Sequence, residues 1–142
     1  MKIVIGANEK GFELKEYVKK YLLGKGHEVI DKTPEKNLDL VESAKLVAKT
    51  MQNKEADRGI AIDEYGAGSF MVANKFKGVI CAEVSDEHSA MMTRGHNNAC
   101  MIAMGSELVG KGLAKGIVDA FVDSEYAGGR HQIRVDMLNK ML

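Results

Sequence analysis

The chain has 142 residues, of which 45% are hydrophobic, and its 20 basic side chains are balanced by 20 acidic ones. This length and apolar content predict one domain, residues 1–142, with a substantial hydrophobic core. A formal net charge of zero gives no electrostatic reason to expect nucleic acid or an anionic membrane as a partner. Because a strand-like pattern begins at Lys2 and no long apolar stretch follows, we expect no signal peptide, no membrane span and a cytoplasmic location.

Short apolar runs alternate with amphipathic stretches along the chain. The runs predict strands at residues 2–7, 28–31, 59–62, 79–84 and 99–104. Apolar residues at a spacing of three and four predict helices, which we expect at residues 12–23, 69–74, 85–95, 110–122 and 131–141, with a further one beginning after Asp39. Ser85 is the expected cap of the helix at 85–95, and the helix at 131–141 has an apolar side made of Ile133, Met137, Leu138 and Met141. Such alternation implies right-handed crossovers and an α/β fold, with a parallel sheet covered by helices on both faces.

Cys81 and Cys100 are the two cysteines, and both lie in strand-like apolar runs. Their spacing matches no metal motif, so we interpret them as small core residues. Polar residues that could do chemistry lie instead between the elements, and the carboxyl ends of parallel strands meet at one edge of a sheet. We therefore expect four segments to converge on that edge: 8–11, 63–66, 85–88 and 94–98.

The loop after the third predicted strand is the first candidate site. Gly66 and Gly68 would let backbone N–H groups approach an anion, and the helix that follows adds a favourable dipole. Asp63 and Glu64 place two carboxylates at the head of the same loop, which conflicts with anion binding. Three interpretations stay open: a lone general base, a loop from which a ligand has been lost, or a tight connection without any ligand.

A second group of candidates lies later in the chain. His96 is flanked by Gly95 and two asparagines, and its imidazole suits proton transfer at neutral pH, although a plain helix C-cap is the alternative. Arg130 and Arg134 are four residues apart, so in a helix they share a face that suits a phosphate. Two surface arginines paired with acids such as Glu125 are the alternative.

Longer motifs resemble the ribose-5-phosphate isomerase B and galactose-6-phosphate isomerase family over essentially the whole chain. They are KIVIGA at 2–7, GFELK at 11–15, GHEVID at 26–31, ADRGI at 56–60, GAGS at 66–69, ANK at 73–75, HN at 96–97 and GGRHQIRVD at 128–136. The resemblance implies a three-layer α/β/α Rossmann-like sandwich with a five-stranded parallel sheet. It also implies isomerisation of a phosphosugar from aldose to ketose through a cis-enediolate, without metal or cofactor, in a cleft shared by two subunits.

The resemblance further implies roles for individual residues, of which this chain keeps one half. His96 matches the acid/base that opens the sugar ring, and Asn97 matches a ligand of a substrate hydroxyl. Arg130 and Arg134 match the residues that bind the phosphate (the phosphate clamp). In the family, these residues act across the subunit interface. The other half departs from the family and forms a degenerate half-site. In this half-site, Asn8-Glu9 stands where the family has an Asp-His pair, and Asp63 stands where it has the base cysteine. Glu64-Tyr65 takes the place of a Gly-Thr pair, and Leu40 takes the place of a tyrosine. Gly66 and Gly68 remain as in the family.

Electrostatics agrees with this pattern of losses. A carboxylate about 4 Å from an enediolate costs roughly 4 kcal/mol at an effective dielectric constant of about 20. An oxyanion donor contributes a similar amount, about 3–4 kcal/mol. A carboxylate at residue 63 or 64 would therefore cancel much of what the glycine loop offers a reacting sugar.

Three functional hypotheses follow. In the first, a hetero-oligomer with a homologous cysteine-bearing subunit interconverts galactose 6-phosphate and tagatose 6-phosphate. In the second, the chain is self-sufficient and uses Asp63 or Glu64 as its base. In the third, it is a non-catalytic scaffold that stabilises a partner. The fold class alone also permits a nucleotide or flavin site, but residues 6–11 lack the glycine pattern of a dinucleotide fingerprint.

Overall fold

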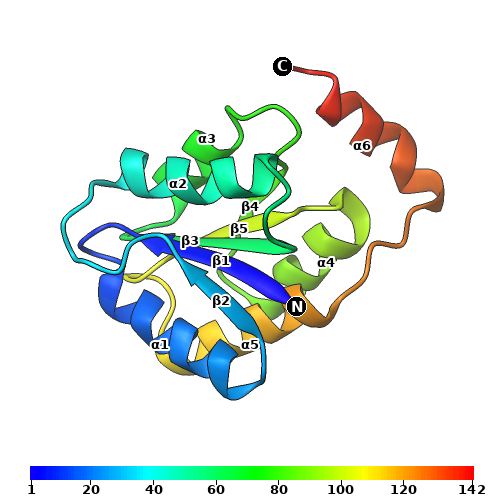
Figure 1. Cartoon of the computed structure of the whole chain (residues 1–142). Helices are drawn as coiled ribbons and strands as arrows, with labels where there is room; N and C mark the ends of the chain where they lie inside the picture. The colour runs from blue at the N-terminus through cyan, green and yellow to red at the C-terminus, as the bar shows by residue number, and fades with distance from the viewer.

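The structure, a computed structural model, describes all 142 residues, and strands alternate with helices along the chain (Figure 1). The strands are β1 (Lys2–Ala7), β2 (Glu28–Asp31), β3 (Arg58–Asp63), β4 (Cys81–Glu83) and β5 (Met101–Gly105). The helices are α1 (Phe12–Gly24), α2 (Leu40–Gln52), α3 (Ala67–Ala73), α4 (Glu87–Asn97), α5 (Lys111–Asp123), the 3-10 turn η1 (Gly129–His131) and α6 (Gln132–Asn139). None of the helices has the length and apolar character needed to cross a membrane.

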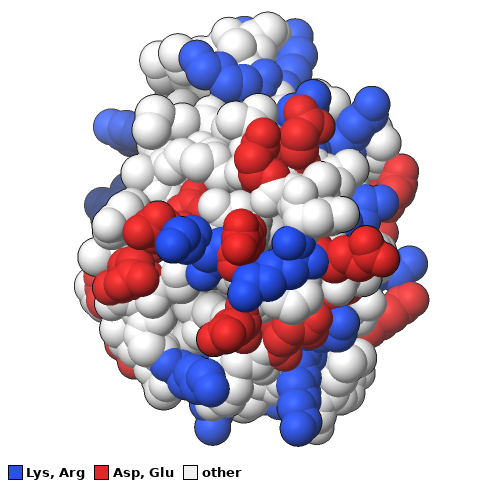
Figure 2. All heavy atoms as spheres, turned by 90° about the vertical axis from the view of Figure 1, so that its left-hand side faces the viewer, with Lys and Arg blue, Asp and Glu red and all other residues white.

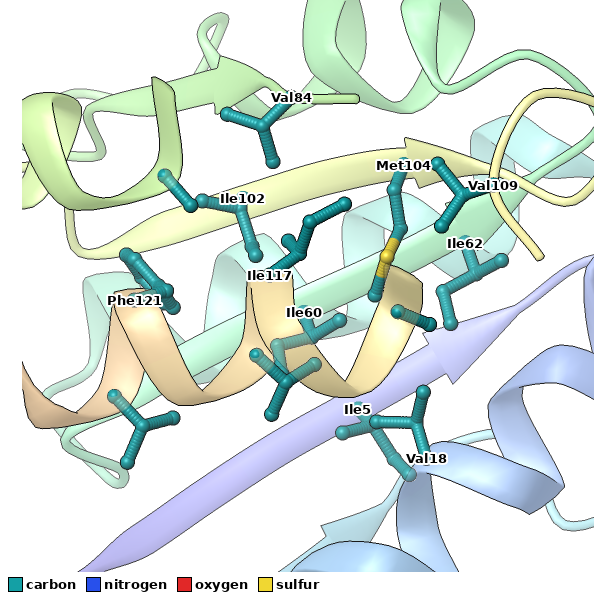
Figure 3. Packing of buried hydrophobic residues seen from close by; sticks show 14 of the residues in the cluster. Ile5, Val18, Ile60, Ile62, Val84, Ile102, Met104, Val109, Ile117 and Phe121 are labelled. Carbon is teal, nitrogen blue, oxygen red and sulfur yellow. The ribbon is translucent and has the colours of Figure 1, made fainter. Parts of the chain in front are cut away.

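All strand pairs are parallel, and the strand order in the sheet is β2-β1-β3-β5-β4. Helices α1, α4 and α5 cover one face, and α2 and α3 cover the other (Figure 1). Because successive strand residues point to opposite faces, Ile5 joins the larger core beneath α1 and α5, whereas Val4 joins the smaller core beneath α2. Figure 3 shows Ile117 and Phe121 of α5 packed toward Ile102 of the sheet. The predicted three-layer sandwich with five parallel strands is confirmed.

Some local expectations from the sequence are wrong. Asp86, not Ser85, caps α4, because its carboxylate accepts the Ser89 N–H at 2.7 Å while the Ser85 hydroxyl donates to Glu83. β4 is shorter than residues 79–84, since it is an edge strand paired only with β5. Cys81 is buried as expected, but Cys100 is only partly buried.

The terminal helix α6 lies at the periphery of the molecule (Figure 1), where Leu138 and Asn139 line a pocket together with Phe76 and Ile80. The apolar side predicted for residues 131–141 is exposed to solvent, with Ile133 of α6 at 69% and Met141, just beyond the end of α6, at 72% exposure, and Val135 is the one buried residue of the helix. Large apolar side chains gathered on an exposed helix are typical of a surface that another chain covers.

A buried ion pair fixes the loop between β2 and α2. Lys15 of α1 is fully buried, and its Nζ donates to the Asp31 carboxylate at 2.9 Å and to the Thr33 carbonyl at 2.8 Å. Lys19 approaches the same carboxylate at 2.8 Å. Burial alone would raise the pKa of Asp31, but hydrogen bonds from Lys19 and Lys15 outweigh burial and hold this pKa below its ordinary value. The pair thus ties α1 to the carboxyl edge of the sheet.

Replacing Lys15 with methionine should destabilise the protein by about 2–4 kcal/mol, because the Thr33 carbonyl loses its buried donor and Asp31 its buried partner. Urea unfolding at one fixed protein concentration measures this change. Lys19→Met is the matched control, since Lys19 is 30% exposed, and should cost less than about 1 kcal/mol. Equal losses in the two variants would contradict the assigned role of Lys15.

Candidate active site

The two groups of candidate residues lie at opposite edges of the sheet. Parallel pairing places Met101 at the amino edge and Asp63, beside Gly105, at the carboxyl edge. His96 lies in the last turn of α4, just before β5, and therefore at the amino edge. The four residue steps from Met101 to Gly105, at about 3.3 Å each, separate the edges by roughly 13 Å. The expectation that segment 94–98 joins the carboxyl edge is wrong, because α4 carries the chain back across the sheet.

At the carboxyl edge, the Asp63 carboxylate closes the glycine loop. Asp63 is only 3% exposed, and one of its oxygens accepts the N–H groups of Tyr65, at 3.0 Å, and Gly66. Its other oxygen accepts the N–H of Ser69 at 2.9 Å and the Ser69 hydroxyl at 2.6 Å. Of the two glycine N–H groups that the sequence suggested for an external anion, that of Gly66 donates to Asp63, whereas that of Gly68 does not. The conflict between carboxylate and anion site is resolved because the chain supplies the anion itself.

Neighbouring residues fill the space around this loop. Leu40, at the start of α2, lies so close to Gly68 that a Cβ there would meet its side chain at 2.7 Å. The Asn8 amide oxygen accepts the Gly11 N–H at 3.0 Å, so it caps a turn. No cavity of the chain is lined by a residue of the 63–68 segment. Figure 2 shows this side of the molecule, where acidic and basic side chains are mixed and neither sign dominates.

The remaining side chains of this half-site are more accessible. Glu9 and Tyr65 are exposed and Glu64 is half-buried. The negative charge of Glu64 is the main cause that raises the pKa of the Tyr65 hydroxyl, with smaller effects from burial and Glu107. Tyr65 therefore stays a neutral phenol at neutral pH, beside a carboxylate that repels anions.

At the amino edge, Arg94 holds the end of α4. Arg94 is 7% exposed, and its guanidinium donates to the Ala99 carbonyl and to the Asn98 side chain, each at 2.6 Å. Burial lowers the pKa of Arg94, which still leaves the group charged. His96 and Asn97 are both exposed on this fixed last turn. Sequence reasoning missed Arg94, whose signal is a basic residue in the last turn before an Asn-Ala pair.

The segment before α6 is attached to the same helix end. The Ala127 N–H donates to the Gly95 carbonyl at 2.9 Å, and the glycine pair 128–129 turns the chain with φ values of +63° and +56°. The turn brings His131 onto His96, with ring centroids 4.3 Å apart and ring planes inclined by 13°. Sequence reasoning did not select His131, although it lies within the family motif.

Arg130 lies in η1 and Arg134 in the first turn of α6, and both are exposed. Neither forms a salt bridge within the chain, so the alternative of a pairing with Glu125 is wrong. Burial is the main cause that lowers the pKa of His131, followed by the nearby His96, Arg130 and Arg134. The end of α4 and the start of α6 thus gather two imidazoles and two unpaired guanidiniums.

The model of a family described as ribose/galactose isomerase matches residues 3–138. The chain belongs to the ribose/galactose isomerase family. Within this isomerase family, galactose-6-phosphate isomerase subunit LacA of Clostridium acetobutylicum is 69% identical over 142 residues, which is 100% of both chains. Subunit LacA of Staphylococcus aureus strain Newman is 58% identical over 141 residues, covering 99% of each chain.

Solved structures of the family have the same fold. Ribose-5-phosphate isomerase B of Clostridium thermocellum superposes with a TM-score of 0.96 at 36% identity, covering 99% of this chain and 97% of that one. The Mycoplasma genitalium isomerase B with bound ribulose 5-phosphate has a TM-score of 0.91 at 36% identity, covering 98% and 94% of the two chains. The resemblance found in the sequence motifs is confirmed.

In this ribose/galactose isomerase family member, Asp63→Asn should destabilise the fold by about 2–3 kcal/mol. The amide lacks the charge that strengthens the hydrogen bonds, and its NH₂ group would face donors of the loop. Glu64→Gln is the control, because Glu64 accepts none of these bonds, and it should change stability by less than about 0.5 kcal/mol. Thermal unfolding compares the two, and an Asp63→Asn variant as stable as the wild type would refute a structural role.

Proposed function

We propose that the chain is a subunit of a hetero-oligomeric isomerase that interconverts galactose 6-phosphate and tagatose 6-phosphate. It supplies His96, Asn97, Arg130 and Arg134 to a cleft whose cysteine base belongs to a homologous partner subunit. The high identity to proteins named as subunits of galactose-6-phosphate isomerase supports both the substrate and the partner. We place the reaction in the cytoplasm, in keeping with two cysteines that are free thiols.

The contrast between the two edges of the sheet carries this proposal. The N–H groups of Tyr65, Gly66 and Ser69 donate to Asp63, and Leu40 packs over Gly68, so this edge offers a sugar few donors. At the other edge, the imidazole of His96 and the two guanidiniums are exposed and unpaired. Catalytic groups that are exposed and unpaired within their own chain can serve a cleft that another chain completes.

The exposed apolar side of α6 supports such a partner. Its side chains lie directly after the proposed phosphate ligands, so a chain that covers α6 would come close to Arg130 and Arg134. Burial of this apolar surface would favour association. The same contact would bring a base from the partner toward His96.

In the proposed reaction, the two arginines hold the phosphate and Asn97 binds a sugar hydroxyl. His96 opens the ring by moving a proton from the anomeric hydroxyl to the ring oxygen, which leaves an open-chain aldose. The partner's thiolate then removes the C2 proton and returns it to C1 through the cis-enediolate, while the hydroxyl proton of O2 is transferred to O1, so that C2 becomes the ketone and C1 the alcohol. The partner's own glycine-loop amides stabilise the oxyanion that forms between these steps.

The alternative of a self-sufficient enzyme has weaker support. Asp63 accepts four hydrogen bonds and is buried, so its lone pairs are engaged. Glu64 is more accessible, but within the chain it lies at the edge opposite to His96. A scaffold without catalytic residues would also use α6, and only a test of His96 separates it from the proposed subunit.

Isomerase assays on separate and mixed chains test the proposal. We expect this chain alone to be inactive and its mixture with the cysteine-bearing homologue to be active. His96→Ala should lower kcat of the mixture at least about 100-fold, because it removes a general acid and base. His88→Ala, an exposed histidine in the first turn of the same helix, is the control and should leave kcat within about twofold.

Two results would contradict the proposal. Robust turnover by this chain alone, lost in Asp63→Asn or Glu64→Gln, would favour the self-sufficient enzyme. Full activity of the mixture after His96→Ala would favour the scaffold.

Arg134→Ala should raise KM for the phosphosugar about 10–100-fold, because charged hydrogen bonds to the phosphate are lost. The thermal midpoint should not change, since the Arg134 side chain is exposed and unpaired. Lys140→Ala, an exposed cation just after α6, is the control and should leave KM unchanged. A fall in thermal stability with an unchanged KM would identify Arg134 as a structural residue.

A further inference from the structure

We propose that His131 is a positioning residue that holds the His96 imidazole in its working orientation and links it to the phosphate clamp. The observation behind this proposal is the stack of the two rings, at 4.3 Å between centroids and 13° between planes. The inference rests on the proposed function, because the orientation of His96 matters only if His96 opens a sugar ring.

The stack is the contact that restrains the His96 ring. His96 is exposed at the end of α4, and its imidazole makes no hydrogen bond within the chain. The last torsion of a histidine side chain is broad and roughly two-fold, so an unrestrained ring would turn its nitrogens away from a substrate much of the time. A parallel aromatic neighbour favours orientations of the His96 ring that keep its plane parallel to that of His131.

Separate contacts hold His131 in place for this task. Its N–H donates to the Gly128 carbonyl at 3.1 Å, which closes the η1 turn. Just before the turn, the Tyr126 hydroxyl donates to the Gln132 side chain at 2.9 Å and so bridges the glycine pair. The segment is also tied to α4 by the Ala127 N–H. The two rings are therefore carried by elements joined through backbone contacts as well as through the stack.

The position of His131 between Arg130 and Arg134 provides the link to the phosphate. A phosphate gripped by both guanidiniums would order the start of α6, and the ring carried there would order His96. Burial, His96 and the neighbouring arginines lower the pKa of His131, which favours its neutral form beside His96. Phosphate binding would thus prepare the imidazole for ring opening.

Two variants of the assembled enzyme, with its cysteine-bearing partner, test the role in turnover. His131→Ala should lower kcat roughly tenfold and change KM for the phosphosugar by less than about threefold, because orientation is lost while the clamp remains. His131→Phe keeps a stacking ring and should recover most of kcat. An unchanged kcat in His131→Ala, equal loss in both variants, or a rise in KM alone would overturn the proposal, the last by making His131 a phosphate ligand.

Proton NMR of the full chain without its partner gives a readout independent of activity. The ring protons of His96 should carry a ring-current shift that disappears in His131→Ala and persists in His131→Phe. The signals are assigned from the His96→Ala and His88→Ala variants. If His131→Ala leaves the His96 signals unmoved, the stack does not exist in solution and the inference fails. If the stack is present but the wild-type mixture shows no turnover, the proposed function fails instead.

Discussion

A carboxylate held by backbone N–H groups organises the carboxyl edge of this sheet. Converging N–H groups that are buried without an acceptor destabilise a fold, so a glycine loop of this shape needs an acceptor. Asp63 provides one that is covalently attached and therefore always present. Three backbone N–H groups of the loop are thus satisfied without any ligand, whereas a loop that binds a substrate leaves such donors to water in the resting state. In this chain the Asp63 side chain therefore has a structural role in the loop.

The structural role of Asp63 also bears on the residues at the amino edge of the sheet. Parallel strands place Asp63 and His96 at opposite ends, so a chain of this fold cannot bring both to one substrate. The two edges are independent, and the carboxyl edge can lose its chemistry while the amino edge keeps its own. Under the proposed division of labour, a pair of unlike subunits has one productive cleft, formed by the partner's loop and this chain's His96.

The sequence predicted those features that depend on local patterns. Strand and helix periods located β1 and α5, because burial repeats along each element. The edge to which His96 belongs was predicted wrongly, since it depends on how α4 returns across the sheet. The hydrogen bonds of Asp63 could not be predicted from the sequence either, because they require the loop path in which Gly66 takes a φ of +83°. Arg94 and His131 were missed for the same reason, as their partners come from backbone turns and not from a periodic pattern.

The exposed side of α6 also bears on how such a protein is made. A helix whose isoleucine, leucine and methionine side chains are exposed to water favours nonspecific association until the proposed partner subunit covers it. Under the proposed assembly, chains synthesised in excess over the partner subunit would associate with one another or bind a chaperone. Synthesis of both subunits in equal amounts, or their assembly during translation, would keep this surface covered. The stability of the protein would then depend on the ratio in which the two subunits are synthesised.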